Sequence, residues 1–441
     1  MKTLPIRPAP PTPPTPGGRG PGADGPPVDR RWTVARLLTA PHRLGFFSAA
    51  LMLATSALWW AAALVARQAG LALPWAVPPA LAHGLLMGMG FMPLFIVGFL
   101  FTAGPRWLGL PDVAARSLRW PVAAMLSGWA VALIGFHAHA LVAALGIAAV
   151  AGGWSAIVAR FVGLLRRSPV ADQLHARVIA AAAALGALAL WAAAAALTTG
   201  QAIGVRVATQ LALWGCLAPL FWTVSHRMIP FFTTSALPLL DAWRPNWLLW
   251  AGLAALALAG AGAVADLLWW PLPPAWRWAQ LVLEAPAAAL MLWLAVRWGL
   301  VQSLKIRLLA MLHGGFVWLG LALALAAVSH GLQATGVSPA GLGLAPTHAL
   351  TMGYLGCTLI AMITRVAAGH SGRPLAADNP AWALYWGLQT ATLLRLGAVL
   401  WPAAEGPLVL LAVAAWAVAA TGWAWRYGGW LGRPRIDGRP G

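Results

Sequence analysis

The stretch VPPALAHGLLMGMGFMPLFIVGFLFTA (residues 77–103) contains no charged side chain and is long enough to cross the hydrocarbon core of a bilayer as a helix. The rest of the chain has a similar composition: 61% of its 441 residues are hydrophobic and 9% are charged, whereas about a quarter are charged in soluble domains. A soluble domain cannot hide so much apolar surface from water. The sequence therefore predicts an all-α protein, a polytopic transmembrane helical bundle in the lipid bilayer.

Apolar windows of about twenty residues recur on both sides of this stretch. They predict about twelve spans, close to residues 44–66, 77–103, 119–137, 140–160, 178–198, 207–226, 246–267, 278–297, 308–329, 344–366, 380–401 and 407–426. Residues 41–428 thus form a twelve-helix transmembrane domain. Residues 1–40 are rich in Pro and Gly and predict a disordered cytoplasmic tail, and residues 429–441 predict a basic cytoplasmic C-terminal tail.

The positive charges separate between alternate connections. Of the 29 Lys and Arg residues, only Arg67, Arg206 and Arg277 fall on the side opposite both termini, and Arg395 falls inside a span. The positive-inside rule then places both termini in the cytoplasm, which requires an even number of spans. The basic residues lie in short runs between spans, so the formal net charge of +19 does not indicate binding to nucleic acid.

Histidines are the natural ligand candidates, because a neutral imidazole is tolerated at depth in a membrane and coordinates haem iron or copper. His83 opens the second span and His348 opens the tenth, at the same outer level. Each begins a glycine-rich segment, HGLLMGMG or HALTMGYLGC. The small residues would let either a flat macrocycle or a neighbouring helix approach the backbone closely, and both alternatives stay open on the residues alone.

The other histidines divide into two groups. His313, in LHGGFVW, lies deep in the ninth span and needs a hydrogen-bond partner or a metal. His226, in SHRMIPFFT, either caps the end of the sixth span or binds a metal, and capping is slightly favoured. Four histidines at helix ends are expected to be simply solvated at the interface: His137, His139, His175 and His330.

Two charged residues fall inside spans, Glu284 and Arg395, both in the outer half. Burying an unpaired charge is costly, so the two residues either pair with each other or Arg395 meets a haem propionate. The sequence has no P-loop, no dinucleotide-binding fingerprint and no HExxH motif, which excludes the common soluble enzyme classes and ATP-driven transport by this chain itself. Secondary transport stays open, since a small number of polar residues is enough to line a transport pathway.

Four motifs together resemble the NnrS family of bacterial membrane proteins: HALTMGYLGCTLIAMITRVAAGHSGRPL, HRMIPFFT, LHGGFVW and GFLFTAGPRWLG. The resemblance covers about residues 42–375. It implies a haem- and copper-containing protein of the bacterial inner membrane, associated with denitrification, the nitric oxide response and protection against nitrosative stress. The family pattern carries over to His83, His226, His313, His348, Arg365, Gly369, His370, Gly372 and Arg373. Where the family usually has a His-Glu pair opening the second span, this chain has His83-Gly84.

The architecture also resembles the twelve-helix core of haem-copper oxidases, in which histidines of helices 2 and 10 hold a low-spin haem. This resemblance makes His83 and His348 the expected axial ligands of one haem, with Arg395 as a further haem contact. His313 and His226 are candidates for a second metal, copper, where nitric oxide or an iron-nitrosyl species would react with electrons from an unknown donor. The seventh span lacks histidine, so the oxidase binuclear centre is not expected.

Two functional hypotheses follow from these residues. The leading one is redox chemistry at a bis-His haem that protects the cell against nitrosative stress. The alternative is a membrane transporter or exporter of a metal or nitrosyl complex, which would use the same polar residues as a pathway without redox turnover. Whether the protein carries stoichiometric haem distinguishes the two hypotheses.

Overall fold

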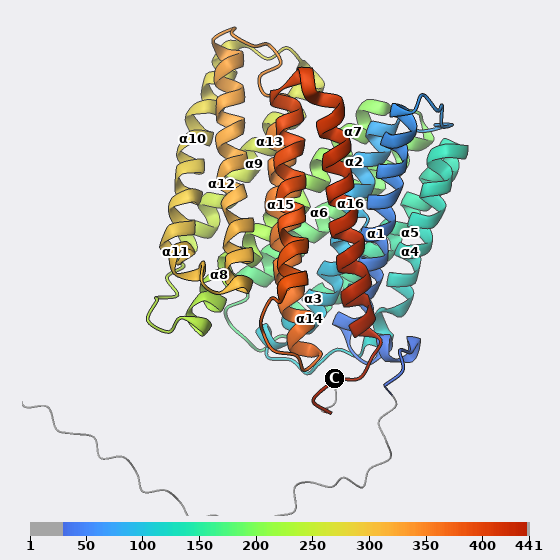
Figure 1. The fold of residues 1–441 in the computed structure, drawn as a ribbon, viewed down its shortest axis with the longest axis vertical. Helices are drawn as coiled ribbons and strands as arrows, with labels where there is room; N and C mark the ends of the chain where they lie inside the picture. Colours follow the sequence, from blue (N-terminus) through green and yellow to red (C-terminus); the bar gives the residue numbers. More distant parts are fainter. Residues whose placement is uncertain (1–29, 439–441) are drawn as a thin grey trace, which may run out of the picture.

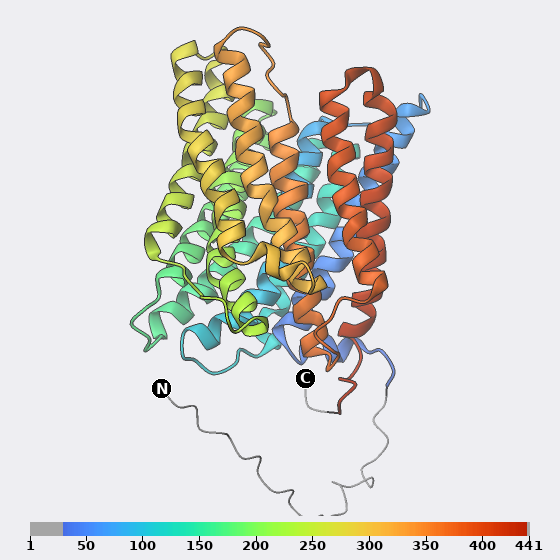
Figure 2. The same ribbon diagram turned by 60° about the vertical axis from the view of Figure 1, so that its left-hand side comes forward.

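The computed structural model describes residues 30–438, and no strand occurs in this range (Figure 1). The long helices stand side by side with roughly parallel axes and form one bundle (Figures 1 and 2). Eleven of the helical segments between residues 30 and 438 are long and apolar enough to cross a membrane. The prediction of an all-α, polytopic helical bundle is therefore confirmed.

The long segments follow the predicted spans in order. They are α1 (Pro41–Gln68), α2 (Pro79–Met89) with α3 (Met92–Trp107), α4 (Arg119–Ala138), α5 (Ala140–Arg167), α6 (Leu174–Thr198), α7 (Ala202–Gln210) with the π-helix η3 (Leu211–Leu217) and α8 (Ala218–Ala236), α9 (Asn246–Trp269), α10 (Pro274–Arg297), α12 (Arg307–Ala334), α13 (Ala345–His348) with the π-helix η4 (Ala349–Gly356) and α14 (Cys357–His370), α15 (Asn379–Leu400) and α16 (Glu405–Leu431). Short helices lie in the connections: η1 (Val34–Leu38), η2 (Ala115–Leu118), α11 (Leu300–Ser303) and η5 (Pro402–Ala404).

Helix α15 accounts for the one predicted span that is not among these eleven segments, at 380–401. It runs beside α16 along the bundle (Figure 2), but it is less apolar than the other spans because it contains residues such as Gln389 and Arg395. Gln389 is buried, and its amide is satisfied inside the bundle: the oxygen accepts from Trp318 Nε1 at 2.7 Å and the nitrogen donates to the Tyr385 hydroxyl at 2.7 Å. These contacts make a polar residue tolerable at this depth.

The second, sixth and tenth spans are irregular. The second breaks between α2 and α3, where Pro93 in the first turn of α3 has no amide hydrogen to continue the helix. The sixth and tenth contain the π-helices η3 and η4, and such segments inside α-helices are frequent at functional sites. The second and tenth spans are also the most enclosed of the eleven, with 78% of the apolar window of each buried.

Helices α4 and α5 are held together through glycines. A Cβ atom added to Gly128 would lie 2.7 Å from the carbonyl oxygen of Gly146, and one added to Gly146 would lie 2.6 Å from the carbonyl oxygen of Gly128. About two turns further along the pair, a Cβ atom added to Gly153 would lie 2.6 Å from the carbonyl oxygen of Pro121. Small residues allow this close backbone approach, which is a main source of helix association where lipid replaces water.

Both described ends of the chain lie at the same end of the bundle, which we call the inner end; the opposite end is the outer end (Figure 2). Trp32 Nε1 donates to the Gly428 carbonyl at 3.2 Å, and the Thr33 amide donates to the Gly432 carbonyl at 2.9 Å. Of the predicted N-terminal tail, residues 1–29 lie outside the described residues, and 30–40 include η1. At the other end, α16 continues to Leu431, beyond the predicted boundary at 428, and residues 439–441 are outside the described part.

Candidate functional site

His83 lies on α2, near the outer end, with its ring held in a fixed orientation. The imidazole stacks on Trp60 of α1, with ring centroids 4.1 Å apart and an angle of 29° between the planes. Its Nδ1 atom is enclosed and has no hydrogen-bond partner among the described residues. A buried polar atom without a partner is costly, so this imidazole retains a ligand-binding capacity that no described protein group uses.

His348 ends α13 at the outer end of the tenth span. Its Nδ1 atom is 3.0 Å from the carbonyl oxygen of Leu344, one turn earlier. A carbonyl can only accept, so Nδ1 carries the hydrogen and Nε2 keeps its lone pair. Histidines that ligate metals commonly have this arrangement, because the second hydrogen bond fixes the tautomer and the ring and makes the ligating nitrogen more basic.

The two histidines lie on accessible strips of otherwise enclosed helices. The half-buried residues recur every four positions, and so share one face of each helix: His83, Gly84, Met87 and Gly88 on α2, and Thr347, His348, Thr351 and Met352 on α13 and η4. His83 and His348 are close enough to interact electrostatically. Two central helices therefore expose a histidine-bearing strip at the same outer level.

Arg395 of α15 lies within electrostatic range of both imidazoles. It forms no hydrogen bond or ion pair with a side chain in residues 30–438, although Glu405 at the start of α16 is within electrostatic range. Of the two alternatives for Arg395, pairing with Glu284 does not occur, because the Glu284 carboxylate is paired with His330. The guanidinium group is therefore free to bind an anionic group beside the two histidines.

The glycines after the two histidines lie against neighbouring helices. A Cβ atom on Gly353 or Gly356 would meet the ring of Trp318 or Trp416, so helix packing accounts for the glycines of the tenth span. A Cβ atom on Gly84 would lie 3.2 Å from Thr209 Cγ2, and one on Gly88 would lie 3.6 Å from Leu217 Cδ1. The second span is thus covered less tightly than the tenth, but its glycines also lie in contact with a neighbouring span.

His226 forms a buried pair with His175 near the inner end. His175 Nε2 and His226 Nδ1 are 3.0 Å apart, and His226 Nε2 is 3.2 Å from the Pro245 carbonyl oxygen. His175 is only 3% exposed, so its predicted solvation is wrong. The expected capping by His226 is also wrong, because α8 continues through Pro230 to Ala236 and His226 lies inside the helix.

His313 of α12 has its own partner: its Nε2 atom is 3.0 Å from Thr233 Oγ1, while its Nδ1 atom is enclosed and unpartnered among the described residues. Thr233 follows His226 by about two turns of α8, so the two histidines are engaged at separate places. Within residues 30–438 no three His, Cys, Asp or Glu side chains gather closely enough to hold a metal ion. The copper site at His226 and His313 stays a prediction.

The family-motif residues at the end of α14 build the inner end of the bundle. His370 packs on His42 of α1, with ring centroids 4.1 Å apart. The Arg365 guanidinium lies 4.4 Å from the ring centroid of Phe232, and that of Arg373 lies 4.1 Å from the ring centroid of Trp430. Gly372 has a φ of 72°, which glycine adopts without strain, and Gly369 lies against Leu375.

Of the remaining histidines expected to be solvated, only His139 is exposed; it accepts from the Leu141 amide at 3.1 Å and caps α5. His137 accepts from Trp59 Nε1 at 2.9 Å. His330 of α12 is bonded to the buried carboxylate of Glu284 on α10, with Nδ1 and Oε2 2.7 Å apart. The sequence could not reveal the partners of His137 and His330, because each partner belongs to a different helix.

The Glu284–His330 pair leads to a stability prediction. We expect Glu284→Leu to lower the free energy of unfolding by about 1–3 kcal/mol, because it leaves the partly buried His330 ring nitrogen unsatisfied. The double variant Glu284→Leu/His330→Leu is expected to recover most of this loss, since replacing both polar partners with apolar groups can be nearly neutral. Thermal unfolding in detergent measures both values, and a double variant less stable than the single one would contradict the pairing.

The family model described as NnrS protein matches residues 36–435 of the chain. The matched range contains every span described above, and with them His83, His348 and Arg395. No curated protein matches the chain.

Proposed function

Because the chain belongs to the NnrS family, we propose that it holds one haem between its second and tenth spans and protects the cell from nitrosative stress by redox chemistry at that haem. Membership of the family indicates a haem/copper protein of the nitric oxide response in general terms. The bis-His ligation, the redox chemistry and the protective role are our proposals for this chain.

The observation that supports the proposal is the pair of accessible strips on the two most enclosed helices. Each strip carries one histidine with a ring nitrogen that no described residue occupies, and the guanidinium group of Arg395 lies within electrostatic range of both. A haem ligated by two histidines needs two axial nitrogens, and an apolar surrounding and a cation near its propionates favour its binding. The residues present fit these three conditions.

A haem bound by two imidazoles would supply six-coordinate iron that transfers single electrons. The residues of the chain would hold and tune it. The Leu344 carbonyl keeps the His348 tautomer that leaves Nε2 free, and Trp60 limits rotation of the His83 ring. Arg395 would neutralise a propionate and hold that edge of the haem toward α15.

Copper is not part of this proposal. The candidate ligands His226 and His313 have separate hydrogen-bond partners, and the described residues offer no cluster of three ligands. We place the protein in the bacterial inner membrane with the inner end in the cytoplasm, which is supported by the concentration of Lys and Arg in the connections on that side. An electron donor would have to act on the haem from outside the chain.

The test is the absorption spectrum of detergent-purified protein, oxidised and dithionite-reduced, before and after addition of nitric oxide. We expect one low-spin haem per chain, with a spectrum that nitric oxide changes or with measurable consumption of nitric oxide. Haem that does not respond to nitric oxide would indicate a sensor or an assembly factor. A colourless protein, expressed with ample haem, would overturn the proposal and leave export of a metal or nitrosyl complex as the better hypothesis.

A further inference from the structure

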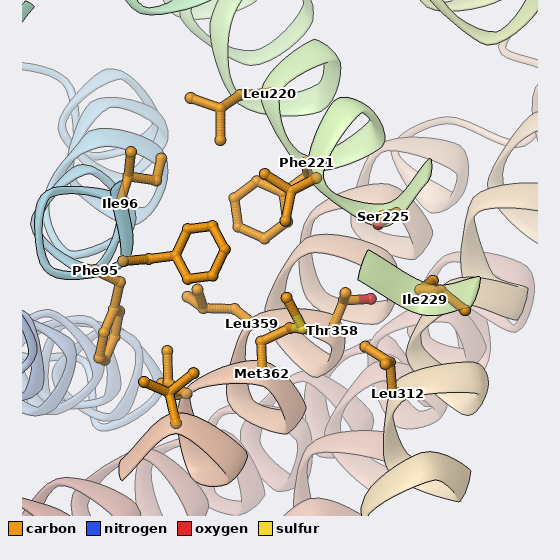
Figure 3. Close-up of a pocket in the computed structure, with 14 residues that line it drawn as sticks. Phe95, Ile96, Leu220, Phe221, Ser225, Ile229, Leu312, Thr358, Leu359 and Met362 are labelled. Carbon is orange, nitrogen blue, oxygen red and sulfur yellow. The ribbon is translucent and has the colours of Figure 1, made fainter. Parts of the chain in front are cut away.

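An apolar cavity of about 50 Å³ lies inside the bundle, about two turns inward of the two histidine-bearing strips. Figure 3 shows side chains of α3, α8, α12 and α14 around it. Its lining is mainly apolar and includes Phe95, Ile96, Leu220, Phe221, Leu359 and Met362. Aromatic rings, branched aliphatic groups and a thioether make an apolar surface that offers no charge to a ligand.

The cavity has only two hydroxyl groups in its lining, those of Ser225 and Thr358. The Ser225 hydroxyl is 3.0 Å from that of Tyr354 and is therefore engaged. Thr358 Oγ1 has no partner among the described residues, but it lies close to the backbone of Gly315. A buried water needs two to four polar partners, so one free hydroxyl does not hold water well. The cavity therefore favours a dry, uncharged occupant.

The volume limits the occupant further. A single water-sized sphere needs about 10–15 Å³ on this scale, so about 50 Å³ accommodates a molecule of two or three atoms or a noble-gas atom. A quinone ring or a lipid chain is too large. Small anions such as nitrite are excluded by the absence of Lys, Arg or His from the lining residues.

The second and tenth spans, which carry the strips, also line the cavity, at a level nearer the inner end of the bundle. Leu217 faces Gly88, which belongs to the α2 strip, and Leu220, about one turn later in the sixth span, lines the cavity. In the second span, Phe95 lines the cavity about two turns after Gly88. A small apolar molecule in the cavity would thus be separated from the strip by the Leu217 side chain and its neighbours.

We propose that this cavity is a holding site for a small, uncharged, apolar gas molecule close to the His83 and His348 strips. The identity of the gas rests on the proposed function. The small molecule on which that function acts is nitric oxide, which partitions from water into apolar surroundings. No covalent or redox step occurs in the cavity.

Xenon tests the holding site directly, because it enters dry apolar cavities and does not need haem. In crystals of the full-length protein pressurised with xenon, we expect an anomalous peak among Phe95, Phe221 and Leu359. The peak should be lost in Leu359→Trp, whose larger ring fills the space, and kept in Leu393→Trp, a matched change at an exposed position of α15. The milder Ile363→Phe serves if Leu359→Trp does not fold.

A wild-type map with xenon only in the surrounding detergent, or with ordered water or an acyl chain in the cavity, would overturn the holding site. A xenon peak in a protein that never contains haem would leave the holding site standing and reject the proposed function. In haem-loaded protein, Leu359→Trp should slow the spectral response to nitric oxide several-fold relative to Leu393→Trp, while the haem spectrum before nitric oxide stays unchanged.

Discussion

Replacing either His83 or His348 with alanine is expected to abolish the low-spin haem spectrum of the purified protein. Each imidazole is the sole candidate on its strip, and the tenth-span histidine is already held in the ligating tautomer by the Leu344 carbonyl. Loss of one axial ligand leaves five-coordinate, high-spin iron or allows the haem to dissociate. Reduced-minus-oxidised spectra and haem-to-protein ratios of the two variants measure the effect.

The matched control is His139→Asn, because His139 is a histidine near the outer end that is exposed and caps α5. Asparagine can make the same cap, so this variant should keep the full haem content. If His83→Ala and His348→Ala both retain the wild-type spectrum, the haem is held elsewhere and the proposed site is wrong. A loss in only one of the two variants would reject the bis-His arrangement.

The second large effect is expected from Gly146→Leu, which should lower the free energy of unfolding by about 3 kcal/mol or more. A side chain at this position would meet the Gly128 carbonyl oxygen and the Ala132 backbone, and neither can move without separating α4 from α5. Because this close approach holds the two helices together in lipid, the loss cannot be recovered by a change of rotamer. The thermal unfolding midpoint in detergent measures the loss.

Gly152→Leu is the control for this prediction. It lies on the same helix, and a Cβ atom added there would meet nothing within 4 Å. Leucine also has a higher helix propensity than glycine, so this variant should be as stable as the wild type or slightly more stable. Equal destabilisation by the two substitutions would show that helix propensity or insertion, and not the contact between α4 and α5, determines the effect.

The spans could be predicted from the sequence because each one carries its own signal, an apolar length matched to the bilayer. The separation of charge predicted an even number of crossings, and α15 is consistent with it although Gln389 and Arg395 make it less apolar. The levels of His83 and His348 followed directly from the spans. These features depend on local composition and on length, both of which a single sequence contains.

The buried polar pairs could not be predicted, because they depend on which helices become neighbours. His42 and His370, or His175 and His226, come from distant parts of the chain and meet only after the bundle has packed. The sixth span was predicted to end at His226 because Arg227 and Pro230 follow. In the structure the helix continues through Pro230, and Thr234 Oγ1 donates to the carbonyl of that proline at 3.0 Å.

The π-helix η4 affects how other chains should be aligned with this one. A π-turn contains one residue more than an α-turn. The segment between His348 and the inner residues Arg365 and His370 therefore contains one residue more than a continuous α-helix of the same length. For a relative whose tenth span is a continuous α-helix, an alignment without a gap across Ala349–Gly356 would shift its inner residues by one position. They would then lie about 100° around the helix from their true counterparts. A relative without the π-turn should instead be aligned with a one-residue gap there.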